Sequence, residues 1–176
     1  EHAGLHTIGM DLKARDEVVS AASLAAFIGR HAPDVDVDEL AGAPEAAIVV
    51  RRVEALKTLV RVGAIDGASE SATDKTSLDA DIRLLMDPTS TSPGSAVAMR
   101  TYAGDGSAKG VTVTATHLET GRRVSCVTDR EGIGHVKLAW PGAWRMEFHK
   151  VTAPTDEAGW MIESSTVTFE VREVAP

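Results

Sequence analysis

The sequence predicts an α+β fold in which a small mixed α/β N-terminal part is followed by a seven-stranded antiparallel β-sandwich. Residues 78–172 hold seven short runs rich in apolar and β-branched residues, separated by Gly, Pro and Asp, a spacing typical of two packed sheets. Residues 1–65 instead mix strand and helix periodicities. Residues 66–77 are rich in Ser, Thr, Asp and Gly, which predicts a loop or linker between the two parts.

The N-terminal part is predicted to run strand, helix, helix, strand. Apolar residues on alternate positions over 5–12 indicate a half-buried strand, and residues 24–28 have helical spacing behind a capping serine. A second helix is predicted over 44–57, because Pro suits its first turn and its apolar residues share one face. Residues 58–62 return to a strand pattern. The acidic stretch 34–39 lacks the spacing of a calcium loop and is expected to be a solvated loop or helix entry.

The seven expected strands of the C-terminal part end at turn residues. They cover 78–86, 96–102, 111–117, 122–127, 133–140, 144–151 and 160–171. The run from Val111 to His117 is the clearest, because its residues are largely β-branched and the apolar ones alternate. Seven such strands are enough for two packed sheets.

Composition narrows the classes of function. The chain has 18 basic and 26 acidic residues and a net charge of −8, which disfavours a nucleic-acid partner. Its single cysteine, Cys126, allows no internal disulfide. No apolar run approaches the roughly 18 residues of a membrane span, so no membrane insertion is expected. The sequence carries no enzyme motif, which favours a non-enzymatic protein. Because the chain begins at Glu1 without a Met, we expect a processed or trimmed chain, and 1–65 is the remainder of a truncated domain in that case.

Three short motifs carry a resemblance to known β-sandwiches. They are the Gly-initiated strand at 110–113, the Thr-Asp-x-x-Gly turn at 128–132 and the Pro-Gly-x-Trp turn at 141–144. Asp129 can bond the turn backbone, and Gly132 can adopt the positive φ of a tight turn. Together the motifs resemble transthyretin-like and carboxypeptidase-regulatory-like domains, and they imply an immunoglobulin-like arrangement of strands.

The resemblance extends over most of the chain to one bacterial exported family. The segments that carry it are 24–31, 57–63, 85–88 and 144–149. The family, formerly of unknown function, is described as a periplasmic component of cobalt or nickel transport. It implies an exported, periplasmic protein, a nickel or cobalt ligand, and membrane transport subunits as partners. Family members carry one or two histidines on the strand after the Trp turn, where this chain has His149 followed by Lys150.

Histidines and tryptophans are the candidate site residues. His2, His6 and His149 are candidate ligands for a divalent transition metal, because neutral imidazole suits nickel and cobalt. Trp144 and Trp160 are candidates for contact with a small ligand, and core packing is the alternative. The sequence therefore predicts an exported binding or accessory protein for transition-metal uptake. A structural or protein-interaction module is the alternative, and a carbohydrate-binding module is the least favoured.

Overall fold

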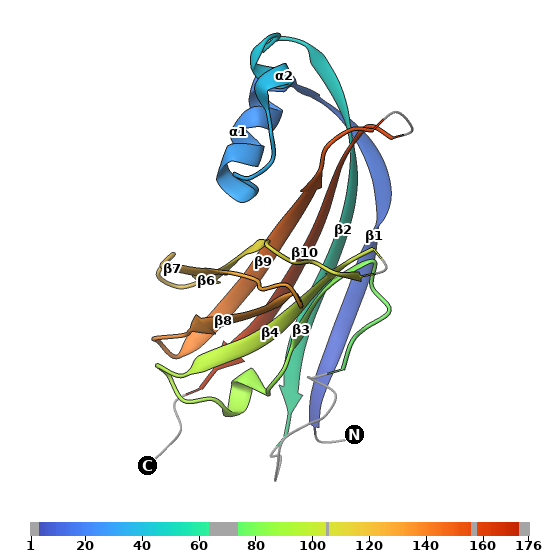
Figure 1. Cartoon of the computed structure of the whole chain (residues 1–176). Coiled ribbons are helices and arrows are strands. Elements are labelled where there is room, and N and C mark those ends of the chain that lie inside the picture. The colour runs from blue at the N-terminus through green and yellow to red at the C-terminus, as the bar shows by residue number, and fades with distance from the viewer. Residues whose placement is uncertain (1–3, 64–73, 105, 156–157, 173–176) are drawn as a thin grey trace.

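A computed structural model describes residues 4–63, 74–104, 106–155 and 158–172, which form ten strands in two sheets (Figure 1). The six-stranded sheet contains, in spatial order, β1 (Gly4–Ser20), β2 (Ala47–Val62), β10 (Trp160–Val171), β9 (Gly142–Thr152), β6 (Thr112–His117) and β7 (Arg123–Val127). The four-stranded sheet contains β3 (Ala80–Leu84), β4 (Ala96–Ala103), β5 (Gly106–Ser107) and β8 (Ile133–Lys137), and β4 pairs with the other three. The helices are α1 (Ala21–His31), α2 (Asp38–Ala41) and the 3-10 turn η2 (Pro88–Ser90).

The predicted fold class is wrong, because the described residues form ten strands in two sheets. The chain does not place a mixed α/β part before a seven-stranded sandwich. Instead β1 and β2 extend the larger sheet, because β2 pairs antiparallel with β1 and parallel with β10. Each of the seven runs expected in the C-terminal part contains a strand, and both sheets remain open. The expected linker over 66–77 lies mostly outside the described residues.

The helix expected over 44–57 is also wrong, since residues 44–46 form a turn and residues 47–57 belong to β2. Ile48, Val49, Val50 and Val53 are β-branched and lose side-chain freedom in a helix. In the sheet the same segment gains a hydrogen-bonded neighbour on each side. Tertiary pairing therefore decides the structure of a segment whose apolar spacing also fits a helix.

One apolar core lies between the two sheets. Trp144, Met146 and Phe148 on β9 are fully buried there, opposite Ile82 of β3 and Met99 of β4, among others. A buried ion pair also joins the two sheets. Lys57 Nζ on β2 contacts Asp81 Oδ1 on β3 at 2.5 Å and donates to the Ile82 carbonyl at 2.6 Å.

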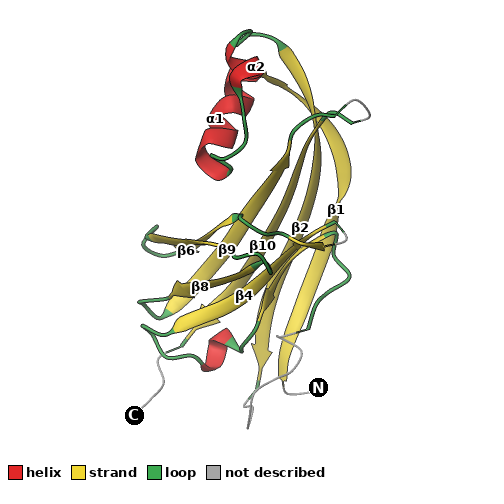
Figure 2. Cartoon of the chain, in the orientation of Figure 1, coloured by secondary structure: helices red, strands yellow, loops and turns green. Residues whose placement is uncertain are grey.

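A second apolar cluster lies on the opposite face of the six-stranded sheet, which we call the outer face. Because side chains alternate along β9, Phe148 points into the core between the sheets while Val151 points the other way. Leu24 and Ile28 of α1 pack against Val151 and Ile162 there. Figure 2 shows both α-helices at one end of the long strands, away from the four-stranded sheet.

The Thr-Asp-x-x-Gly turn connects the two sheets, since β7 and β8 belong to different ones. Asp129 Oδ1 accepts the backbone N–H groups of Glu131 at 2.8 Å and Ile133 at 2.9 Å. Gly132 has a φ of 76°, and a side chain there would approach the Thr101 carbonyl at 2.9 Å. The motif therefore forms the turn by which the chain passes from one sheet to the other.

Candidate functional site

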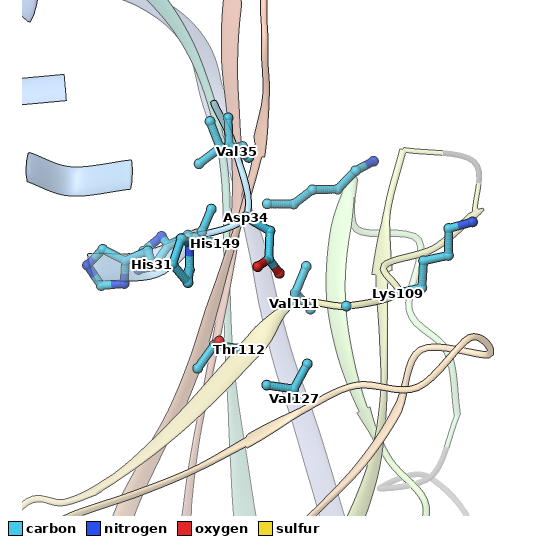
Figure 3. A pocket seen from close by; sticks show the side chains of 13 residues that line it. His31, Asp34, Val35, Lys109, Val111, Thr112, Val127 and His149 are labelled. Carbon is cyan, nitrogen blue, oxygen red and sulfur yellow. The ribbon is translucent and has the colours of Figure 1, made fainter. Parts of the chain in front are cut away.

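A cavity of about 410 Å³ lies where the loop after α1 approaches β6 and β7. Figure 3 shows His31 and His149 side by side at one end of it. Asp34 projects into it from the loop, and Val111 and Val127 lie on the opposite side. The site thus combines two imidazoles, one carboxylate and apolar walls.

Helix α1 positions His31. Ser20 caps the helix, because its Oγ accepts the Ser23 N–H at 3.2 Å. The helix ends just after His31, where the Ala32 N–H donates to the Ile28 carbonyl at 2.7 Å. Ile28 is fully buried against the outer face, which fixes the last turn of the helix over β9. His31 is therefore held at the edge of the cavity.

Strand β9 supplies the second imidazole, and a neighbouring strand fixes its orientation. His149 lies opposite Ser164 of β10, and its Nδ1 shares a 2.7 Å hydrogen bond with the Ser164 hydroxyl. The ring centres of His31 and His149 are 4.4 Å apart with an interplanar angle of 70°. Phe27 contacts both rings, at 4.6 Å from His31 and 5.2 Å from His149. Because Nδ1 of His149 is engaged, its Nε2 is the nitrogen left for a ligand.

The surroundings of both imidazoles favour their neutral forms. Burial, together with the nearby His31 and Arg52, lowers the pKa of His149 to about 4. Burial also lowers the pKa of His31, with Arg30 and Arg123 acting in the same direction and Glu147 opposing them. Both rings are therefore neutral near pH 7, the state in which imidazole nitrogen can bind a metal ion.

The other predicted metal ligands do not join this pair. His2 lies outside the described residues. His6 is on β1, which is separated from β9 by β2 and β10, a separation of about 14 Å across the sheet. Within the described part of the chain, no three His, Cys, Asp or Glu side chains form a ready-made metal-binding group.

The two predicted tryptophan contacts are buried. Trp144 is 0% exposed in the core between the sheets, and its Nε1 donates to the Trp140 carbonyl at 3.0 Å. Trp160 is 8% exposed and packs in the cluster under α1. The Trp144 indole is therefore enclosed by the core, whereas Trp160, although largely buried, lines two pockets.

Sequence reasoning missed His31, which was regarded only as part of the end of a helix. The spacing of Phe27 and His31 was the available signal, because residues four apart lie on the same helix face. Nothing local indicated that this face would meet His149.

Searches of protein-family models, curated proteins and solved structures find no match to this chain. Among the described residues, no helix has both the length and the apolar character needed to cross a membrane.

Proposed function

We propose that this protein binds a divalent transition-metal ion, nickel or cobalt, and acts as an exported accessory component of metal uptake. The observation that carries the proposal is the contact between His31 and His149 beside the cavity.

A metal ion bound by two neighbouring imidazoles constrains the distance between their rings. With metal–nitrogen bonds of about 2.1 Å, each ring centre lies about 3.2 Å from the ion, so ligands at right angles have centres about 4.5 Å apart. The observed separation of 4.4 Å fits this arrangement. Adjacent positions at right angles are found in the square-planar and octahedral geometries available to nickel and cobalt. The separation of the two ring centres is therefore compatible with imidazoles that share one ion.

The chemistry of the pair supports the same ions. Imidazole nitrogen suits nickel, cobalt, copper and zinc, whereas magnesium and calcium prefer oxygen ligands. The lowered pKa values keep both rings deprotonated at neutral pH, so metal binding does not have to displace a proton from either.

The sequence resemblance supports the biological setting. His149 lies on the strand after the Pro-Gly-x-Trp turn, where the family of cobalt and nickel transport components also carries histidine. Membrane transport subunits in the periplasm are the corresponding partners. His31 supplies the second imidazole that this strand lacks.

Titration calorimetry with nickel, cobalt, zinc and copper chlorides tests the proposal on the full chain. We expect wild type to bind nickel or cobalt, and His31→Gln and His149→Gln each to weaken binding at least tenfold. His135→Gln is the matched control, because His135 is exposed on β8 in the other sheet. Absence of binding by wild type, or an equal loss in all three variants, would contradict the proposal.

A protein-interaction module is the second candidate, and a different observation favours it. The outer face below α1 exposes an apolar strip, in which cross-strand partners of β1 and β2 lie side by side. The strip consists of Ile8 (60% exposed), Met10 (55%), Leu56 (41%), Val60 (40%) and Val62 (39%).

Metal dependence separates the two candidates. If the strip docks a membrane transport subunit, Leu56→Glu should abolish crosslinking to that subunit in membranes while leaving nickel binding unchanged. Crosslinking should also persist in a chelator. Wild-type levels of crosslinking by the variant would rule out this surface.

A further inference from the structure

We infer that Asp34 supplies a third protein ligand, so that two imidazoles and one carboxylate hold the metal ion. This inference rests on the proposed function and names a residue that completes its site.

A tight turn places Asp34 over the cavity. The Val35 N–H donates to the Ala32 carbonyl at 3.0 Å, which closes a four-residue turn with Pro33 at its second position. Proline fixes φ there, so the backbone of the turn is preset. Asp34 follows at the third position, three residues after His31, and its carboxylate points into the cavity (Figure 3).

The Asp34 carboxylate has no hydrogen-bond or ion-pair partner among the described residues, whereas Asp36 Oδ1 accepts the Asp38 N–H at 2.9 Å. Asp36 lines a separate shallow pocket with Glu39 and Trp160. Of the acidic residues in the stretch 34–39, Asp34 alone lines the cavity beside the imidazoles.

The Asp34 carboxylate would supply the negative charge that compensates a bound divalent ion. Asp34 is the one carboxylate among the described lining residues, and the other charged groups there are Lys109 and Lys150. Lys150 forms an ion pair with Glu163 at 3.3 Å. A divalent ion beside two neutral imidazoles would otherwise lack a compensating negative charge, and a charge removed from water is costly without one.

The three side chains are not yet assembled around a single point. Asp34 is exposed, so its side chain can adopt another rotamer, and the inferred site requires one that turns the carboxylate toward the imidazoles. The remaining coordination positions would face the cavity, where water or a small exchangeable ligand could occupy them. Such an open site suits a protein that passes its metal on, and the nitrogen and oxygen donors favour nickel or cobalt over copper(I).

The test compares two charge-removing substitutions in the same acidic stretch. We expect Asp34→Asn to weaken nickel and cobalt binding in calorimetry by about 10- to 100-fold. Asp36→Asn, the matched control, should change it less than threefold. The visible absorption spectrum of the cobalt complex should also change in Asp34→Asn and return toward the wild-type spectrum in Asp34→Glu, because loss of a ligand alters the coordination geometry.

The outcomes distinguish this inference from the function on which it rests. If wild type binds nickel through His149 but Asp34→Asn matches Asp36→Asn in affinity and cobalt spectrum, the role of Asp34 is refuted and the metal site stands. Equal weakening by both substitutions would likewise indicate a general charge effect and refute it. If wild type binds neither ion, both the inference and the proposed function fail.

Discussion

The two faces of the six-stranded sheet bury their apolar residues in different ways. The face toward the four-stranded sheet contributes to a large core that includes Trp144 and Phe148, both 0% exposed. The outer face has a smaller cluster under α1, where Leu24 and Ile28 pack against the sheet. His149 is half-buried and contacts Phe27, which packs against this outer cluster. The larger core thus lies on one face of the sheet, and the partly exposed imidazoles lie on the other.

Polar groups follow the same division. Between the sheets, the charge of Lys57 is compensated within the protein by Asp81. On the outer face, His31 and His149 are kept neutral by their surroundings. A buried compensated pair joins two layers permanently, whereas two neutral imidazoles remain able to accept a proton or a metal ion. One sheet thus carries a buried ion pair in the core on one face and two imidazoles that can bind a proton or a metal ion on the other.

The largest expected effect comes from breaking the compensated pair. Asp81→Asn leaves the Lys57 ammonium, 5% exposed, without its carboxylate and should lower the free energy of unfolding by about 3–5 kcal/mol. Burial already lowers the pKa of Lys57 while Asp81 raises it, so the substitution should lower that pKa further. Chemical denaturation measures the loss.

A double substitution separates charge from packing at this position. Lys57→Met combined with Asp81→Leu removes both charges, so it should be less damaging than Asp81→Asn alone. Some loss should remain, because Asp81 Oδ2 also accepts the Thr76 N–H at 3.0 Å. A double variant less stable than the single one would show that the uncompensated charge is not the cause.

The sequence predicts the strands of the C-terminal part well because their signals are local. Turn residues such as Asp129 and Gly132 act on the backbone beside them, and alternation within a strand depends only on which face is buried. The partners of each strand are not local. Residues 44–57 were assigned to a helix because nothing within them indicates that β1 and β10 will pair with residues 47–57 on both sides.

The candidate site shows the same limit. His149 was found through the motif that precedes it on the chain, whereas His31 lies on a helix distant in sequence. Their contact depends on α1 packing on the outer face rather than on the face toward the four-stranded sheet. An amphipathic pattern gives the buried side of a helix but does not specify the surface that it covers. The pairing of the two imidazoles therefore required the tertiary structure.

A smaller and reversible effect is expected from acidification, and it should act on the outer face. The pKa of His149 falls from 6.5 to about 4 on folding, so the unfolded chain binds more protons between these values. Stability should therefore decrease as pH falls from about 6.5 to about 4, by at most about 3 kcal/mol from this residue. Protonation of His149 would place its positive charge beside Arg52 and His31, which repel it. The Glu147 carboxylate acts in the opposite direction at His31, where it favours a positive charge.

The control is a variant that keeps an aromatic ring but cannot take up the proton. His149→Phe should flatten the dependence of the unfolding free energy on pH between about 6.5 and 4, and carboxylates that titrate in this range contribute equally to both proteins. Hydrogen exchange should locate the wild-type response at the amides of α1 while those of β3 and β4 stay protected, because the core between the sheets does not include His149. Equal pH dependence in wild type and His149→Phe would assign the response elsewhere. Loss of protection in both clusters together would show that the two faces unfold as one cooperative unit.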